Sequence, residues 1–169
     1  MKHAAFPLAL ALAACTAASP PVEGTPPPPA ASPAPEASAS EPAGPTRILN
    51  QDAAYRLRNN SGVTLQWIDW DRRGDARVTV GPDGVWRLSA AQSAPDGPGR
   101  VSVEGRVTEI GADYFLLDGR VTISDTPDVG RQCSDDRVWR FGVTQGRKYW
   151  RLREFEWCDS LTDYVDIYF

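Results

Sequence analysis

The side chains in this chain that could do chemistry are mainly carboxylates, arginines and tyrosines, because the one histidine is His3. Cleavage of the signal peptide expected over residues 1–14 would remove His3. The remaining chain then has no imidazole for Ser-His or Cys-His catalysis or for a histidine-bound zinc. Lys148 is the one lysine outside that segment, and no glycine-rich phosphate loop is present. The sequence therefore predicts no cofactor and no metal site.

Carboxylates are the remaining candidates for catalytic groups. Glycoside hydrolysis needs two carboxyl groups flanking the scissile bond, and acids cluster near the end of the sequence at Glu154, Glu156, Asp159, Asp163 and Asp166. Turns and exposed strand ends are rich in acids for other reasons. We therefore favour a non-enzymatic domain and keep a carboxylate-based glycosidase acting on wall polymers as an alternative.

Tyrosine and arginine gather at the same end of the sequence. By strand alternation, one face of the strand expected at 147–154 and one face of the strand expected at 163–169 carry polar and aromatic side chains, while the other faces carry Trp, Leu, Val, Ile and Phe. If the two strands pair, the outer face presents Tyr149, Arg151, Tyr164, Asp166 and Tyr168. Such a face is either a solvated polar surface or a binding surface for an envelope protein or a glycan, since Tyr and Arg dominate interface hot spots.

The first residues form an export signal. Lys2 supplies a positive start and Ala4–Ala14 is a short apolar run, too short to span a bilayer. The run ends in Leu12-Ala13-Ala14-Cys15, which resembles the lipobox of bacterial lipoproteins. The resemblance implies removal of residues 1–14, lipidation of Cys15 with palmitate-type acyl chains, and a membrane anchor. An ordinary secretory signal with an incidental Cys15 is the alternative.

A spacer follows the proposed anchor over residues 15–46. Ten of the 31 residues 16–46 are proline, and none is aromatic. A Pro/Ala-rich stretch of this composition cannot bury enough apolar area to order itself, so we expect a disordered linker. Residue 16 is Thr rather than Asp, which by the same resemblance implies the outer membrane, facing the periplasm.

The rest of the chain, 47–169, is long enough for one domain with a core. Its period-2 patterning predicts about eight antiparallel strands, with no helix of useful length. The strands are expected near 62–70, 75–80, 84–90, 100–110, 114–124, 138–144, 147–154 and 163–169. The fold class is therefore all-β, a small barrel or a sandwich.

One hairpin can be registered from the pattern alone. Keeping the apolar sets together requires Val101 opposite Ile123, Val103 opposite Val121 and Val107 opposite Leu117, because a one-residue slip would place Arg120 opposite the core set. The loop is then Gly111-Ala112-Asp113. This register also sets Gly105 opposite Gly119, which leaves a notch for an aromatic side chain or a bend in the sheet.

Two cysteines lie in the predicted domain, Cys133 and Cys158. Disulfides persist in exported chains, so we expect these two to pair. Free thiols or a metal pair are the alternatives, although no histidine and no third domain cysteine is present to complete a metal site.

The end of the chain also resembles a family. Tyr149–Leu152 (YWRL), Cys158 and Asp163–Phe169 (DYVDIYF) are similar to the closing segment of uncharacterised bacterial envelope proteins. The resemblance implies a secreted β domain without a known activity. With a formal net charge of −4, nucleic acid is not an expected partner. We therefore predict a lipid-anchored domain for binding or scaffolding in the cell envelope, or alternatively a calycin-like barrel for a small apolar ligand.

Overall fold

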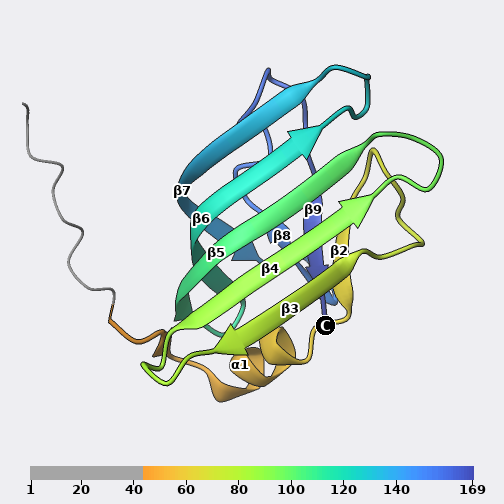
Figure 1. Cartoon of the computed structure of the whole chain (residues 1–169). Helices are drawn as coiled ribbons and strands as arrows, with labels where there is room; N and C mark the ends of the chain where they lie inside the picture. Colours follow the sequence, from red (N-terminus) through yellow and green to blue (C-terminus); the bar gives the residue numbers. More distant parts are fainter. Residues whose placement is uncertain (1–43) are drawn as a thin grey trace, which may run out of the picture. The chain divides into compact units, whose positions relative to one another are not determined.

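The computed structural model describes residues 44–169, which form one nine-stranded sheet with a short helix (Figure 1). The all-β prediction is confirmed. The elements in chain order are β1 Arg47–Ile48, α1 Gln51–Arg58, β2 Gly62–Leu65, β3 Asp75–Val80, β4 Trp86–Ser93, β5 Arg100–Ile110, β6 Tyr114–Ser124, β7 Gln132–Gly142, β8 Tyr149–Leu152 and β9 Val165–Tyr168.

The sheet curls into a nearly closed barrel. The strand order is β2-β9-β8-β7-β6-β5-β4-β3, and every neighbouring pair along this path is antiparallel. Val63 and Gly74 then exchange two backbone hydrogen bonds, of 3.0 and 2.8 Å, which bring β2 back beside the start of β3. In Figure 1, β3 to β7 form the front wall and β8, β9 and β2 lie behind them. The structure thus selects a barrel over a sandwich.

Gln92 closes the remaining seam between β2 and β4. Its buried side chain accepts the backbone N–H of Leu65 at 2.6 Å. It also donates to the carbonyl oxygens of Asp69 and Arg72, at 2.8 and 2.7 Å. Buried backbone groups need partners, and this amide supplies three of them where no strand pair is available.

The predicted register of the β5–β6 hairpin is confirmed. Val101 lies opposite Ile123, Val103 opposite Val121 and Val107 opposite Leu117. A bulge between Val107 and Glu109 then shifts the pairing, so that Ile110 points inward where alternation from Val107 would point it out.

The predicted pairing of two glycines across the β5–β6 hairpin is also confirmed. Gly105 lies directly opposite Gly119, and the indole Nε1 of Trp139 donates a 2.8 Å hydrogen bond to the Gly119 carbonyl. A Cβ on Gly119 would lie 2.5 Å from the Gly105 Cα. Close backbone approach therefore requires glycine here, and Trp139 packs beside the pair.

Aromatic side chains fill the barrel interior. Phe115 stacks on Phe141 with ring centroids 4.8 Å apart, and Trp150 meets Phe115 edge-on at 5.6 Å. All three, and Trp139, are fully buried within one core cluster. This packing supplies the large apolar burial that stabilises the fold.

The sequence prediction missed β1 and α1. Asn50 caps α1, its side chain accepting the N–H of Ala53 at 2.8 Å, and the helix adds Ala53, Ala54 and Leu57 to the core. Three buried residues on two turns give too short a stripe for a helical period to stand out. The cap, Asp52 in the first turn and arginines in the last turn were the available signal.

Two strand boundaries differ by more than three residues, and several others differ by two or three. The strand expected at 138–144 is β7, which begins at Gln132, because the charged run 132–137 pairs with β6 along its whole length. The strand expected at 62–70 ends at Leu65, and the chain turns there, with Ile68 donating back to the Leu65 carbonyl at 2.9 Å.

The proposed Cys15 anchor and most of the 15–46 linker lie outside the described residues. Thr46, at the predicted boundary, is already part of the fold: its hydroxyl donates to Val107 and accepts from the N–H of Trp86. None of the helical structure in residues 44–169 has the length and apolar character needed to cross a bilayer.

Candidate functional site

The structure brings the five predicted surface residues onto one outer face of the barrel. β8 and β9 pair as expected, with Tyr149 opposite Tyr168 and Arg151 opposite Asp166, and Tyr164 immediately precedes β9. Their neighbours Trp150, Leu152, Val165 and Ile167 point into the core. We call Tyr149, Arg151, Tyr164, Asp166 and Tyr168 the Tyr/Arg face.

Arg151 and Asp166 form a bidentate ion pair at the centre of this face. Arg151 Nε donates to Oδ1 at 2.8 Å and Nη2 donates to Oδ2 at 2.7 Å. Asp166 is 0% exposed and Arg151 8%. Burial raises the pKa of Asp166, and the hydrogen bonds and charge of Arg151 offset part of that rise.

Aromatic rings surround the guanidinium group of Arg151. Its carbon lies 3.9 Å from the centroid of the Tyr164 ring, 5.1 Å from that of Tyr149 and 5.8 Å from that of Trp70. The Tyr149 hydroxyl also accepts from Nη2 at 3.2 Å. Trp70 is 44% exposed and extends the aromatic surface outward. Stacking and hydrogen bonds therefore hold Arg151 in a single position.

The face is only partly open to solvent. The segment between β2 and β3 packs against it, with Arg73 4.0 Å from the Tyr168 ring centroid and Trp67 donating to Asp163 at 3.1 Å. All three tyrosines of the face are half-buried, and burial raises the pKa of Tyr168. A strand pattern cannot reveal which distant segment covers its outer side.

A groove of about 400 Å³ adjoins the Tyr/Arg face. Its lining residues are Thr144, Gln145, Arg147, Arg151, Arg153, Phe155 and Tyr164. Three of them are arginines and none is acidic. The segment 147–153 that supplies them carries four basic residues and no acid. We call this depression the arginine groove.

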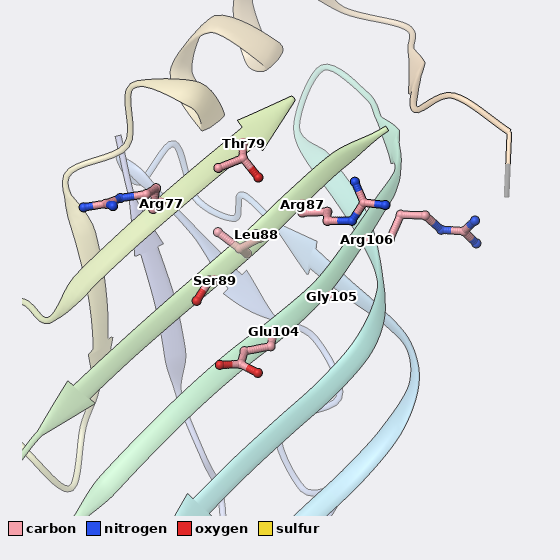
Figure 2. Close-up of a pocket in the computed structure, with 8 residues that line it drawn as sticks. All are labelled: Arg77, Thr79, Arg87, Leu88, Ser89, Glu104, Gly105 and Arg106. Carbon is pink, nitrogen blue, oxygen red and sulfur yellow. The ribbon is translucent and has the colours of Figure 1, made fainter. Parts of the chain in front are cut away.

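A second groove, of about 520 Å³, lies on β3, β4 and β5. Figure 2 shows Arg87 and Arg106 close together at one end, with Glu104 and Ser89 further along the strands. Arg106 pairs with Asp118 at 2.9 Å, and Arg87 approaches Asp83 at 4.0 Å. Charges of both signs line or border this groove: Arg87 and Arg106 each face an acid and Glu104 is in the lining, whereas Arg77 forms no ion pair in the described residues.

The cysteine prediction is confirmed: a disulfide joins Cys133 on β7 to Cys158 in the loop between β8 and β9. Arg131 contacts the same loop: it donates hydrogen bonds to both carboxylate oxygens of Asp159 and to both of Asp163. These bonds lower the pKa of Asp159. Asp159 also lies beside the two sulfur atoms, but sulfurs joined in a disulfide are not thiolate ligands for a metal.

The acids considered for catalysis are engaged elsewhere in the described residues. Asp159 and Asp163 bind Arg131, and Asp166 binds Arg151. Glu154 accepts the backbone N–H of Arg140 at 3.2 Å, and Glu156 accepts from Thr162 at 3.5 Å. Each of these five acids therefore takes part in an ion pair or a hydrogen bond within the domain.

Comparison with known proteins places the chain in a family. Residues 45–169 match the PM1083 family. The chain is also 37% identical to an uncharacterised protein, PM1083 of Pasteurella multocida (strain Pm70), over 116 residues that cover 68% of this chain and 74% of the relative. No solved structure matches. The match to residues 45–169 and the identity to this relative show that the chain belongs to the PM1083 family.

Proposed function

We propose that this chain is a lipid-anchored protein of the cell envelope whose barrel binds another envelope component through the Tyr/Arg face. The binding is non-enzymatic, and the partner is an envelope protein or a glycan. The observation that carries the proposal is the arginine at the centre of the face, held by Asp166 and stacked on Tyr164 beside the exposed Trp70.

Such a surface has the composition of an interface hot spot. Tyr, Trp and Arg contribute most of the energy at measured interfaces because they combine large contact area with polar groups. A side chain that is already fixed loses little conformational entropy on binding. Arg151 meets this condition through its three hydrogen bonds to Asp166 and Tyr149.

Interior packing favours a surface site over a calycin-like cavity. Phe115, Trp139, Phe141 and Trp150 are all fully buried in the barrel core. A small apolar ligand in the centre would have to displace aromatic side chains that stabilise the fold.

The anchor rests on Leu12–Cys15 and on the linker that follows. Several acyl chains on Cys15 would hold the protein on a membrane almost permanently. A Cys15→Ala variant should therefore appear in the soluble envelope fraction or stay unprocessed, and mass spectrometry of the native protein should find acyl groups on Cys15. Membrane retention of the variant, without acyl mass on the native protein, contradicts the anchor.

The binding face is tested in the protein's own membrane. A variant with Tyr149, Tyr164 and Tyr168 changed to Ser, and a second with Trp70→Ala, should both lose the partner that the native protein crosslinks. Tyr55→Ser on α1 is the control, since Tyr55 is 71% exposed and far from the face in sequence. Unchanged crosslinking in the folded Trp70→Ala and tyrosine variants contradicts the proposal.

A further inference from the structure

We propose that the arginine groove binds an acidic saccharide, with the acid group, a carboxylate or a phosphate, seated against Arg147, Arg151 and Arg153. This inference rests on the proposed function and names the ligand class for the same face. The groove's volume, about 400 Å³, falls within the range of about 300–1,000 Å³ typical of small-ligand sites.

The groove carries positive charge that the protein itself leaves unmatched. Arg147 and Arg153 are both exposed, and neither forms an ion pair with any acid in residues 44–169. The β3–β5 groove differs, because Glu104 is in its lining and two of its three arginines, Arg87 and Arg106, face Asp83 and Asp118. At Arg147 and Arg153 an anionic ligand therefore gains attraction without competing against an internal carboxylate.

Arg151 differs from the other buried arginine in the number of donors it has left. A guanidinium group has five N–H donors. Arg131 uses all of them, on Asp159, Asp163 and the Thr126 carbonyl. Arg151 uses Nε once and Nη2 twice, and within the described residues its Nη1 group has no acceptor.

The free Nη1 group is an oriented donor at the groove. Arg151 lines the groove, and the bidentate bond to Asp166 fixes the plane of its guanidinium. The two N–H bonds of Nη1 diverge, so this group can give a charge-assisted hydrogen bond to one oxygen of a carboxylate or phosphate. Arg147 and Arg153 can close on the same anion from the exposed side.

The rest of the lining suits a sugar ring. Phe155 and Tyr164 pack edge-on with ring centroids 5.6 Å apart and supply an apolar wall. The C–H face of a pyranose packs on such rings, and Thr144 and Gln145 offer neutral partners for its hydroxyls. An acidic peptide would satisfy the arginines but would leave this combination of rings and neutral polar groups unused.

The test is isothermal titration of the full-length lipidated protein in detergent with five probes. They are trigalacturonate, glucose 6-phosphate, maltotriose, inorganic phosphate and hexaglutamate. We expect trigalacturonate, glucose 6-phosphate or both to bind at least 10-fold more tightly than maltotriose and inorganic phosphate. Which of the two binds identifies the acid as a carboxylate or a phosphate.

Two double variants locate the site. Arg147→Gln/Arg153→Gln removes the two unpaired charges and should weaken binding at least 10-fold, with a shallower salt dependence. Arg77→Gln/Arg87→Gln removes the same charge from the β3–β5 groove and should change affinity less than 2-fold. An equal loss in both variants overturns the site, because the effect would then follow net charge alone.

Other outcomes overturn the inference directly. These are tightest binding of hexaglutamate, equal binding of maltotriose, inorganic phosphate binding as well as glucose 6-phosphate, or no binding of any probe. None of these results touches the proposed function, which fails separately if the Trp70→Ala and tyrosine variants keep their crosslinked partner.

Discussion

Removing the guanidinium group of Arg151 should destabilise the folded domain, because this group is the partner of a buried carboxylate. Arg151→Met leaves the Asp166 carboxylate, 0% exposed, without its bidentate partner. Breaking a buried pair in this way costs about 3–5 kcal/mol. With an unfolding entropy of about 2.1 cal/mol/K per residue over this domain, the loss lowers Tm by about 12–20 °C.

The loss should depend on pH with a definite sign. Burial already raises the pKa of Asp166, and Arg151 holds that rise in check. Without Arg151 the folded-state pKa rises further, while the unfolded chain keeps its ordinary value of about 3.9. Between these two values the native state binds a proton that the unfolded state does not, so stability falls as pH rises. The deficit of the variant is therefore largest near pH 7 and shrinks toward pH 4.5.

A second substitution separates lost pairing from lost packing. Arg151→Met/Asp166→Leu removes both charges and should recover most of the stability at pH 7, because apolar replacements of a buried pair are often neutral or stabilising. Arg147→Met is the control. Arg147 is exposed and forms no ion pair in the described residues, so its loss should change stability by less than about 0.5 kcal/mol.

The assay is urea and thermal unfolding of the full-length chain, followed by tryptophan fluorescence at pH 7 and pH 4.5. A destabilisation of Arg151→Met below about 1 kcal/mol would refute the buried ion pair. So would a deficit that is equal at both pH values, since the proton linkage of Asp166 would then be absent.

Two further substitutions test the barrel wall and its cross-link. Gly119→Ala places a Cβ against the Glu104 carbonyl oxygen and 2.5 Å from the Gly105 Cα, so urea unfolding should show a loss of about 3 kcal/mol or more. Gly97→Ala meets nothing within 4 Å and should stay within about 0.5 kcal/mol of the native protein. Cys133→Ala/Cys158→Ala opens a loop of sequence separation 25 and should cost about 3.5 kcal/mol in the same assay, whereas an unchanged midpoint contradicts a disulfide in the folded protein.

Alternation predicted the parts of the fold where one strand face is buried and the other is not. In β5 and β6 the apolar residues recur at every second position, so a single register satisfies them. The same logic paired β8 with β9 and placed Trp150 and Val165 inside. These assignments depend on local sequence alone, which is why they were accessible.

The elements that the sequence missed depend on distant contacts. α1 has too few turns for a periodic stripe. The charged start of β7 resembles a turn, yet pairing with β6 extends the strand through it. The cover over the Tyr/Arg face comes from the segment between β2 and β3, whose Trp67 and Arg73 reach Asp163 and Tyr168 across about a hundred residues of chain. Composition could flag the tyrosines and Arg151 but not their burial.

The proposed binding role would account for the Arg151–Asp166 pair, which stability alone does not require. The cost of desolvating both groups offsets most of their electrostatic attraction. An apolar pair of similar volume would therefore stabilise the barrel equally well. Arg131 shows how an arginine serves structure here: every donor is satisfied and three segments are tied together. Arg151 instead keeps one amino group without an acceptor in the described residues and lines a groove free of acids. Asp166 and Tyr164 hold it in that orientation, which is the arrangement expected of a recognition group prepared before its ligand arrives.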